Sequence, residues 1–429
     1  MKTPARHLSS LGVFAMLLGL TFVSTNCGSS GSSVSSSQPA SPAPSASQPP
    51  ASGGSGGTNG GSGSGGSSGS AGGSGSTGGS SSGGSGGTTG DTSTTAALAY
   101  VAGNNAFYGI RVDSASNVST VSGSPYPVTG NILGFSTSGK LLFVSTVASN
   151  FGNSTITSYR ADDNGVLTQL GTTSVQSSGG VRITSDSIGK FLYGTAEATQ
   201  AGQAGTQPAI FGFSIDTNSG TLSALPGSPY FLNGGMGPAM RPLVTPNGSW
   251  VCVSMELART NEGAECYARH ADGSVDGNNF VSPAASSTGI QGMAATNDST
   301  MLLFTDGEQN RVIATNIGNT QNAQSYSSGG AFANGLAVSP MEHWAVVVNR
   351  DSGDLAVFET GVGGLAPTPN HTKAGSNANR VAFSHSGKYV FVTTTDGTLV
   401  YSQESGTGAL TPLNGSSPAS GNGTEIGTM

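Results

Sequence analysis

A short pattern recurs along the last three quarters of the chain and restricts the fold more than any other feature. It consists of two apolar residues around a third residue, a turn rich in Ser, Thr, Gly and Asn, an optional Lys, and four mostly apolar residues. The six copies are LGFSTSGKLLFV from Leu133, ITSDSIGKFLYG from Ile183, PLVTPNGSWVCV from Pro242, MAATNDSTMLLF from Met293, LAVSPMEHWAVV from Leu336 and VAFSHSGKYVFV from Val381. Each copy predicts a hairpin of two buried strands.

A seventh copy of the second strand, LAYV, begins at Leu98. The second strands therefore begin near residues 98, 141, 191, 250, 301, 344 and 389, which are 43 to 59 residues apart. Each is followed by a third strand, such as TITSYRAD, and by a short edge strand, such as TLSAL. Four strands per repeat at this period are typical of propeller blades. The sequence thus predicts an all-β domain over residues 96–429, a seven-bladed β-propeller with four antiparallel strands per blade. A β-sandwich would also have short strands and Gly-rich turns, but it does not explain the repeat.

The first blade lacks an inner strand of its own, because only a linker precedes Leu98. The Ser-Pro dipeptide at 417–418 repeats the turn that leads into inner strands elsewhere. Counting on by the spacing found in the second blade places Ile426 at the inner-strand position. We therefore expect residues 422–429 to complete the first blade and to remove an exposed strand edge.

The first 95 residues differ in composition from the rest of the chain. Lys2 and Arg6 precede an apolar run from Leu11 to Val23, which predicts a secretory signal peptide over residues 1–26. The run is too short to span a bilayer, which takes about 20 helical residues. Residues 27–95 are almost wholly Gly, Ser, Thr, Pro and Ala. They predict a disordered linker, because they bury too little apolar surface to offset their conformational entropy.

The chain has three cysteines, and an odd count in an exported protein leaves one cysteine to explain beside a disulfide pair. Setting Cys27 aside leaves such a pair. With Gly28 and Ser29 after it, Cys27 resembles the lipidation site of bacterial lipoproteins, although Ser24 stands where that family has Leu and Asn26 where it has a small residue. The resemblance implies a lipid anchor on Cys27, and plain secretion is the alternative. Both place the domain outside the cytoplasm, at the cell envelope or beyond it.

The other two cysteines, Cys252 and Cys266, lie in successive predicted strands, WVCVS and AECYA. The loop between them is centred near residue 259, which sets them opposite each other in a hairpin. Directly opposed Cα atoms are about 4.5 to 5.5 Å apart, within the span of a disulfide. Export favours oxidation, so we expect a disulfide; two buried free thiols are the alternative.

Charge and metal-ligand spacing exclude several functions. The formal net charge is -7, and no stretch combines clustered Lys or Arg with aromatic residues, so nucleic acid is not an expected partner. The four histidines of the domain, His270, His343, His371 and His385, do not have zinc-ligand spacing, and Asp162–Gly165 resembles a turn rather than a calcium loop. We expect no metal, no cofactor and a monomer that contacts a membrane only through a lipid anchor.

Two segments resemble a known family. They are LAYVAGNNAFYGIRVDSASNVSTVSGSPYP in the first blade and IFGFSIDTNSGTLSALPGSPYF in the third. Both are similar to YVTN-type, lactonase-like propellers, which are related to bacterial phosphogluconolactonase and to fungal muconate-lactonising enzymes. The resemblance covers residues 96–429 and implies the propeller fold more strongly than an activity.

The functional stretch of that family has Arg and His just before an inner strand and Glu after the following strand. The matching stretch here is MRPLVTPNGSWVCVSMEL, in which Arg241 and Glu256 fall on the Arg and the Glu. Pro242 replaces the His, and Met255 replaces the Asn that precedes the Glu. The resemblance therefore implies a lactone hydrolase with an incomplete catalytic motif, in which Glu256 is the base and Arg241 stabilises the oxyanion.

Three arginines share one place in the repeat. Arg182, Arg241 and Arg380 each come immediately before the predicted inner strand of a blade. These places ring one mouth of a propeller channel, so the three guanidiniums are suited to hold a carboxylate or phosphate. Alternatively, each Arg binds neighbouring loop carbonyls and ties blades together. Four further residues follow second strands and are weaker candidates for the same mouth: Glu197, Asp306, Asn349 and Arg350.

Two functions follow from these observations. The first is a binding or scaffolding propeller at the cell envelope, with an Arg-lined funnel for an anionic small molecule, a glycan or an envelope protein. The alternative is a lactonase-like hydrolase that opens the ring of a sugar acid lactone or a related compound.

Overall fold

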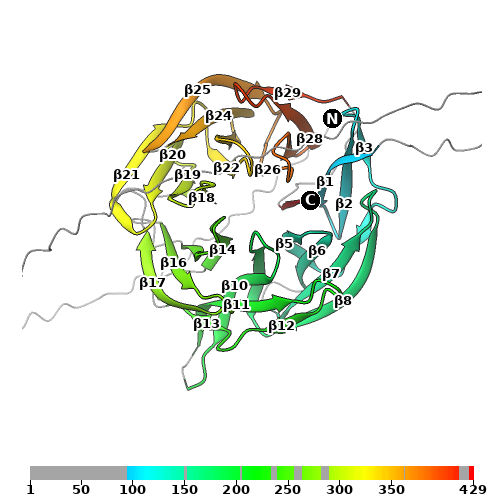
Figure 1. The fold of residues 1–429 in the computed structure, drawn as a ribbon, viewed down its shortest axis with the longest axis vertical. Helices are drawn as coiled ribbons and strands as arrows, with labels where there is room; N and C mark the ends of the chain where they lie inside the picture. Colours follow the sequence, from blue (N-terminus) through cyan, green and yellow to red (C-terminus); the bar gives the residue numbers. More distant parts are fainter. Residues whose placement is uncertain are drawn as a thin grey trace, which may run out of the picture. The chain divides into compact units, whose positions relative to one another are not determined.

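Seven sheets stand around a common axis and form a ring (Figure 1). The computed structural model describes residues 94–148, 152–202, 205–232, 239–255, 263–281, 289–361, 363–414 and 425–429. All of the regular elements in these ranges are strands, and none of the described segments is a helix able to cross a membrane. The fold is therefore the seven-bladed propeller that the repeat predicts. Residues 1–93, with the predicted signal peptide, Cys27 and nearly all of the linker, lie outside the described residues.

Neighbouring strands of a blade pair antiparallel, and in the second to seventh blades they run in chain order from the channel to the rim, whereas in the first blade the last strand of the chain lies inside the first three. The second blade has β5 (Asn131–Ser138), β6 (Leu141–Val147), β7 (Ser154–Ala161) and β8 (Leu167–Val175). The third has β9 (Ser178–Ser185), β10 (Phe191–Thr199), β11 (Thr206–Ile215) and β12 (Leu222–Ala224), with β13 (Tyr230–Phe231) also paired to β11. The fourth has β14 (Ala239–Val244), β15 (Trp250–Met255), β16 (Gly263–Arg269) and β17 (Val275–Val281).

The remaining blades follow the same order. The fifth has β18 (Ile290–Ala295), β19 (Met301–Asp306), β20 (Arg311–Asn316) and β21 (Asn319–Ser327). The sixth has β22 (Ala333–Val338), β23 (Trp344–Asn349), β24 (Asp354–Gly361) and β25 (Gly364–Lys373). The seventh has β26 (Val381–Phe383), β27 (Tyr389–Thr394), β28 (Gly397–Gln403) and β29 (Leu410–Pro412). The first has β1 (Thr95–Ala102), β2 (Ala106–Asp113), β3 (Val118–Thr120) and β4 (Tyr126–Pro127, paired to β2), and it is completed by β30 (Ile426–Thr428).

In four blades, a polar residue of the repeated turn caps the start of the second strand. In the seventh blade, Ser384 Oγ accepts a hydrogen bond from the N–H of Tyr389 at 3.1 Å. Equivalent bonds join Thr245 to Trp250 at 3.1 Å, Thr296 to Met301 at 3.2 Å and Asp186 to Phe191 at 3.0 Å. The glycine of the turn has a left-handed conformation, as Gly387 does with φ of 72°, which glycine adopts at little cost. These local bonds explain why the repeat retains a polar residue and a glycine in its turn.

The core consists of seven hydrophobic clusters of described residues, one between each pair of adjacent blades. Between the first and second blades, for example, the ring of Phe107 packs edge-on against Phe135 and Tyr159, with centroids 5.6 Å apart in both pairs. Burial of a large apolar side chain contributes roughly 1.5–3 kcal/mol. Each cluster takes residues from both of its blades, so an open ring would leave the cluster at the gap incomplete.

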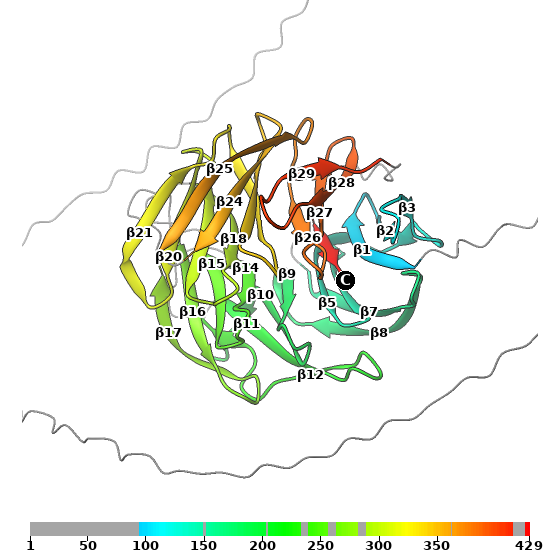
Figure 2. The same ribbon diagram turned by 45° about the horizontal axis from the view of Figure 1, so that its top comes forward.

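The C-terminal strand closes the ring, as the repeat count predicts. Ile426 pairs with Val101, so β30 is the inner strand of the first blade. Thr428 joins β30 to both neighbouring blades: its carbonyl accepts from Thr137 Oγ1 at 2.8 Å, and its Oγ1 donates to the carbonyl of Phe383 at 2.6 Å. Figure 2 shows this short strand between β1, β5 and β26. The last residues of the chain therefore link the first, second and seventh blades.

Cys252 and Cys266 are directly paired on β15 and β16, and the structure joins them in a disulfide. Both residues are fully buried, in the cluster between the fourth and fifth blades. The hairpin geometry expected from the two sequence segments is the geometry observed.

Candidate functional site

The three arginines lie at equivalent places in three blades. Arg182 pairs with the fifth residue of the second strand in its blade, Thr195. The N–H of Arg241 donates to the hydroxyl of Ser254, also a fifth residue, at 3.1 Å, and the N–H of Arg380 donates to Thr393 Oγ1 at 3.0 Å. The same backbone place on the inner strand, which we call the channel position, therefore carries all three guanidiniums.

The other four blades carry no further cation at the channel position. In the second, fifth and sixth blades it is occupied by Gly134, Gly292 and Gly335. A Cβ atom on Gly292 would lie 2.8 Å from the Asn334 carbonyl, so the blades are too close there for a side chain. In the first blade the channel position belongs to Glu425, whose carbonyl accepts from the N–H at the end of β1 at 3.1 Å. One layer of the channel therefore holds three Arg, one Glu and three Gly.

Two of the guanidiniums share the Glu425 carboxylate. Arg241 binds it through both ends, with Nη1 2.9 Å from Oε2 and Nη2 2.5 Å from Oε1. Arg182 Nη1 donates to Oε1 from the neighbouring blade at 3.2 Å. The Glu425 side chain is only 9% exposed, so these ion pairs are screened less than pairs on the surface. Residues from three different blades thus meet on a single carboxylate.

Arg380 immediately precedes β26 of the seventh blade. Its Nη1 is 3.5 Å from Asn334 Oδ1, and the Asn334 amide donates to Asn379 Oδ1 at 2.8 Å. Burial, together with repulsion from Arg241, lowers the pKa of Arg380 to about 9, although Glu425 acts in the opposite direction. Burial and Arg241 also lower the pKa of Arg182. The layer holds three cationic groups and one anionic group, so it carries two positive charges in excess.

Two connected cavities open beside Arg380. The smaller, about 130 Å³, is lined by residues that include Arg241, Gly292, Gly335, Arg380 and Glu425. The larger, about 320 Å³, lies at the mouth of the channel and shares Gln291 and Arg380 with the smaller one. Its other lining residues are Asn334, Arg350, Asn377, Asn379, Thr394 and Thr395. Positive charge and side-chain amides therefore surround the space.

Arg350 lies at the same mouth, whereas Asn349 does not line either cavity. The guanidinium of Arg350 stacks on the ring of Phe332, 3.6 Å from its centroid, and its Nε donates to Asp351 at 2.8 Å. Asn349 is fully buried, and its amide donates to the Ser328 carbonyl at 3.0 Å and to an Asp354 carboxylate oxygen at 2.7 Å. Asn349 thus stabilises the turn that joins β23 to β24 in its own blade.

Two weaker candidates are also engaged within their own blades. Asp306 is fully buried and pairs with Arg311, whose Nη2 is 3.0 Å from Oδ2. Glu197 Oε2 accepts from Thr206 Oγ1 at 2.7 Å. Neither residue is among those that line the two cavities at the Arg-lined mouth. Glu256, the base implied by the family resemblance, lies outside the described residues.

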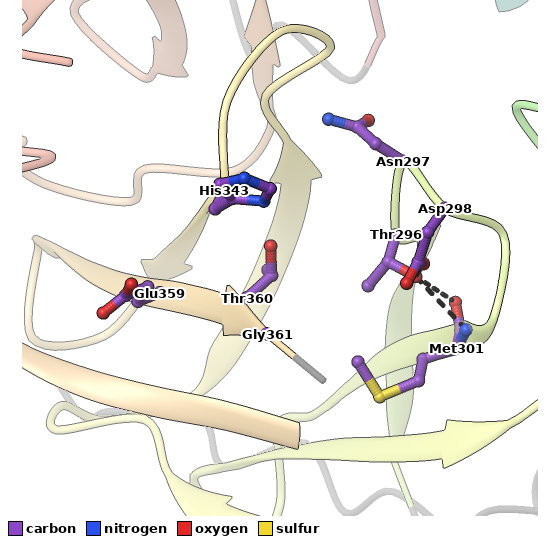
Figure 3. A pocket seen from close by; sticks show the side chains of 8 residues that line it. All are labelled: Thr296, Asn297, Asp298, Met301, His343, Glu359, Thr360 and Gly361. Atoms are coloured by element: carbon purple, nitrogen blue, oxygen red, sulfur yellow. Dashed lines mark hydrogen bonds between the residues drawn. The ribbon is translucent and has the colours of Figure 1, made fainter. Parts of the chain in front are cut away.

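A further cavity, of about 290 Å³, lies between the fifth and sixth blades at the opposite end of the inner strands (Figure 3). His343 of one blade faces Asn297 and Asp298 of the other across it. Asp298 Oδ1 accepts from Thr296 Oγ1 at 2.5 Å and so belongs to the repeated turn. No lining residue of this cavity is Arg or Lys, and the described residues contain no cluster of three or more side chains able to hold a metal ion. This cavity therefore lacks the arginines that line the cavities at the other end of the inner strands.

Glu425 is the site residue that the sequence interpretation missed. The signal was present, because the residue before Ile426 falls at the channel position once Ile426 is taken as the first residue of the inner strand. The three arginines were found by the same register count. Extending that count by one residue into the C-terminal segment would have found their anionic partner.

Comparisons with known proteins identify relatives by structure alone. No protein-family model and no curated protein matches the sequence. The solved structure of a candidate 6-phosphogluconolactonase from Bacteroides uniformis superposes with a TM-score of 0.60 at 16% identity, over 78% of this chain and 99% of that chain. The periplasmic gluconolactonase of Pseudomonas aeruginosa superposes with a TM-score of 0.59 at 17% identity, over 78% of this chain and 99% of that one. A protein from Lactobacillus plantarum gives 0.61 at 14% identity, over 78% and 99%. The chain is thus a seven-bladed β-propeller that shares the fold of lactonase-like proteins, as its repeat segments indicated.

Proposed function

We propose that this protein is an extracytoplasmic propeller that binds a small ligand bearing a carboxylate or phosphate at the Arg-lined mouth of its channel. The observation that carries the proposal is the charge of one layer: three arginines from three blades face a single carboxylate. Guanidinium holds planar oxyanions through two parallel hydrogen bonds. The adjoining cavities supply the space, and the amides around them supply donors and acceptors for the rest of the ligand.

The location outside the cytoplasm is supported by three observations. The N-terminus has the pattern of a secretory signal, and a buried disulfide is typical of proteins that fold in an oxidising compartment. One structural relative is named as a periplasmic protein. A lipid anchor on Cys27 would tether the domain through the Gly/Ser-rich linker, and fractionation with and without Cys27→Ala tests this. Loss of membrane association in the variant supports the anchor.

Calorimetric titration of the full chain tests binding. Gluconate and inorganic phosphate serve as anionic probes, and glucose serves as the neutral control. We expect both anions to bind, glucose not to bind, and Arg380→Gln to weaken anion binding about tenfold or more, because a hydrogen bond to a charged group contributes about 1.5–3 kcal/mol. Arg160→Gln is the matched control, since Arg160 donates only to rim carbonyls among its described contacts. Equal weakening by both substitutions would contradict a channel site.

A lactone hydrolase is the second candidate, and it is favoured by the names of the structural relatives and by the position of Arg241. Glu425 is poorly placed to act as the base, because both of its oxygens accept hydrogen bonds from guanidiniums. Glu256 is therefore the proposed base. A panel of sugar lactones assayed with the wild type and Glu256→Gln decides the question. Turnover that the substitution abolishes supports the hydrolase, whereas turnover equal in both proteins removes Glu256 from the mechanism.

A further inference from the structure

The anionic group at the channel position comes from the last strand of the chain. Glu425 immediately precedes β30, and its backbone is held by the hydrogen bond from Ala102 and by the pairing of Ile426 with Val101. The carboxylate therefore reaches the guanidiniums of Arg182 and Arg241 as part of the folded chain. A tethered group of this kind competes with dissolved anions at a high effective concentration.

We propose that Glu425 is a specificity-determining residue, an internal anion that occupies the Arg182 and Arg241 guanidiniums and so directs an external anion to the Arg380 side of the channel. This inference rests on the proposed anion-binding function and deepens it. It assigns the ligand's charged group to the region between Arg380 and Arg350, where the larger cavity lies, and not to the centre of the layer.

The charge of the layer supports this assignment. Three Arg side chains and one Glu side chain leave the layer with an excess of two positive charges. The Glu425 oxygens accept hydrogen bonds from Arg182 and Arg241. The larger cavity, in contrast, adjoins Arg380. Replacement of the carboxylate by an amide of the same shape raises the excess to three. The Arg182 and Arg241 guanidiniums then lose their anionic partner while remaining in place. The layer should consequently attract small anions more strongly without Glu425 than with it.

The geometry also explains what Glu425 would select against. The smaller cavity adjoins both the Arg241–Glu425 pair and Arg380, so a second anionic group that reached into it from Arg380 would approach the Glu425 carboxylate. Like charges at such a distance repel, which penalises ligands that carry negative charge at both ends. A ligand with one anionic end toward Arg380 and a polar, uncharged remainder toward the amides meets no such penalty.

The direct test is a calorimetric titration of Glu425→Gln with sulfate at constant ionic strength. We expect sulfate to bind this variant about tenfold more tightly than it binds the wild type, which corresponds to about 1.4 kcal/mol. The double variant Glu425→Gln/Arg241→Gln should lose that gain, because it removes the guanidinium that Glu425 had occupied. Glu404→Gln is the matched control, because Glu404 lies at the rim of the seventh blade and accepts from Thr407. It should leave sulfate binding unchanged.

Thermal unfolding keeps the inference testable if Glu425→Gln weakens ring closure. Without sulfate, we expect this variant to have a lower Tm than the wild type, because Arg182 and Arg241 lose the Glu425 carboxylate. As sulfate is added, its Tm should rise more steeply than that of the wild type or of Glu404→Gln, since a ligand bound only by the folded state stabilises it. Comparison with Glu404→Gln removes the general stabilising effect of sulfate. A Tm deficit that sulfate does not restore would overturn the inference and leave Glu425 with a purely structural role.

The outcomes separate this inference from the proposed function. If the wild type binds no anion but Glu425→Gln does, Glu425 does occupy Arg182 and Arg241, but the proposed function fails and the placement of an external anion at Arg380 fails with it. If the wild type binds anions and folded Glu425→Gln binds them equally or less tightly, the proposed function stands and the inference fails.

Discussion

The carboxylate of Glu425 is bound through both oxygens by the guanidinium of Arg241, although 184 residues separate the two in the sequence. Arg241 belongs to the inner strand of the fourth blade, and Glu425 precedes the inner strand of the first. The pair therefore spans the channel between blades that are not neighbours in the ring. The bond that joins the end of the chain to the middle of the domain is also the bond that neutralises part of the candidate site.

A double-mutant cycle on this pair measures its strength. We expect Arg241→Gln and Glu425→Gln to be coupled by about 1–3 kcal/mol in urea unfolding, a range between those of exposed and buried pairs, because the Arg241 side chain is 25% exposed. High salt should reduce the coupling only partly. A coupling energy near zero would mean that the two side chains contribute to stability independently.

Deletion of residues 425–429 should open the ring. The loss removes β30, exposes the edge of β1 and leaves the clusters beside the first blade incomplete. We expect the truncated protein to aggregate and to lose its cooperative melting transition. Size-exclusion chromatography and thermal unfolding check this expectation. A soluble, monomeric truncation with a sharp transition would show that the blade pairs hold together without closure.

Replacement of Arg380 by Met should stabilise the fold while it removes anion binding. The lowered pKa means that the folded protein disfavours the charged form of this side chain. A neutral side chain of similar length avoids the cost of burying the charge, and replacements of this kind can stabilise by about 1 kcal/mol or more. Urea unfolding and the anion titration measure the two effects. Lower stability together with unchanged anion affinity would contradict the role given to Arg380.

The same pKa fixes the sign of a pH effect. Burial and Arg241 hold the pKa of Arg380 in the folded protein at about 9, well below the usual range of an arginine, so the folded state releases this proton more easily than the unfolded state does. Below pH 9 the buried charge lowers the free energy of unfolding, and this cost disappears as Arg380 loses its proton above pH 9. Relative to Arg380→Met, the wild type should therefore gain stability between about pH 9 and 11. Parallel pH profiles for the two proteins would contradict this expectation.

Reduction of the disulfide should lower stability through the unfolded state. Cys252 and Cys266 are 14 residues apart, and a closed loop of about 15 residues corresponds to about 3 kcal/mol in the chain-entropy account. Because both residues are fully buried, native protein should resist reduction, and the loss should appear in the double variant Cys252→Ala/Cys266→Ala. Urea midpoints of the oxidised protein and of this variant give the difference. Equal midpoints would contradict the expected contribution.

The repeat made the fold predictable, because each hairpin has its own turn chemistry and its own apolar strands. Ile426 could be placed for the same reason, since one register count applies to all seven blades. The same count places Glu425 in the layer of the arginines, but it does not predict the local partners of the other candidate residues. Asn349 and Asp306 both end second strands near the mouth, yet a neighbouring turn and Arg311 use them locally. The register specifies the place of a residue in the blade, but it does not specify which neighbouring side chains that residue will bind.

The most direct test of the anion site is anomalous diffraction from crystals of the full chain soaked in selenate. Our account predicts a selenium peak in the channel, in hydrogen-bond contact with Arg380 and on the side of the larger cavity. The peak should move toward Arg182 and Arg241 in crystals of Glu425→Gln. Selenate bound only at surface residues, with none in the channel of either protein, would contradict the account.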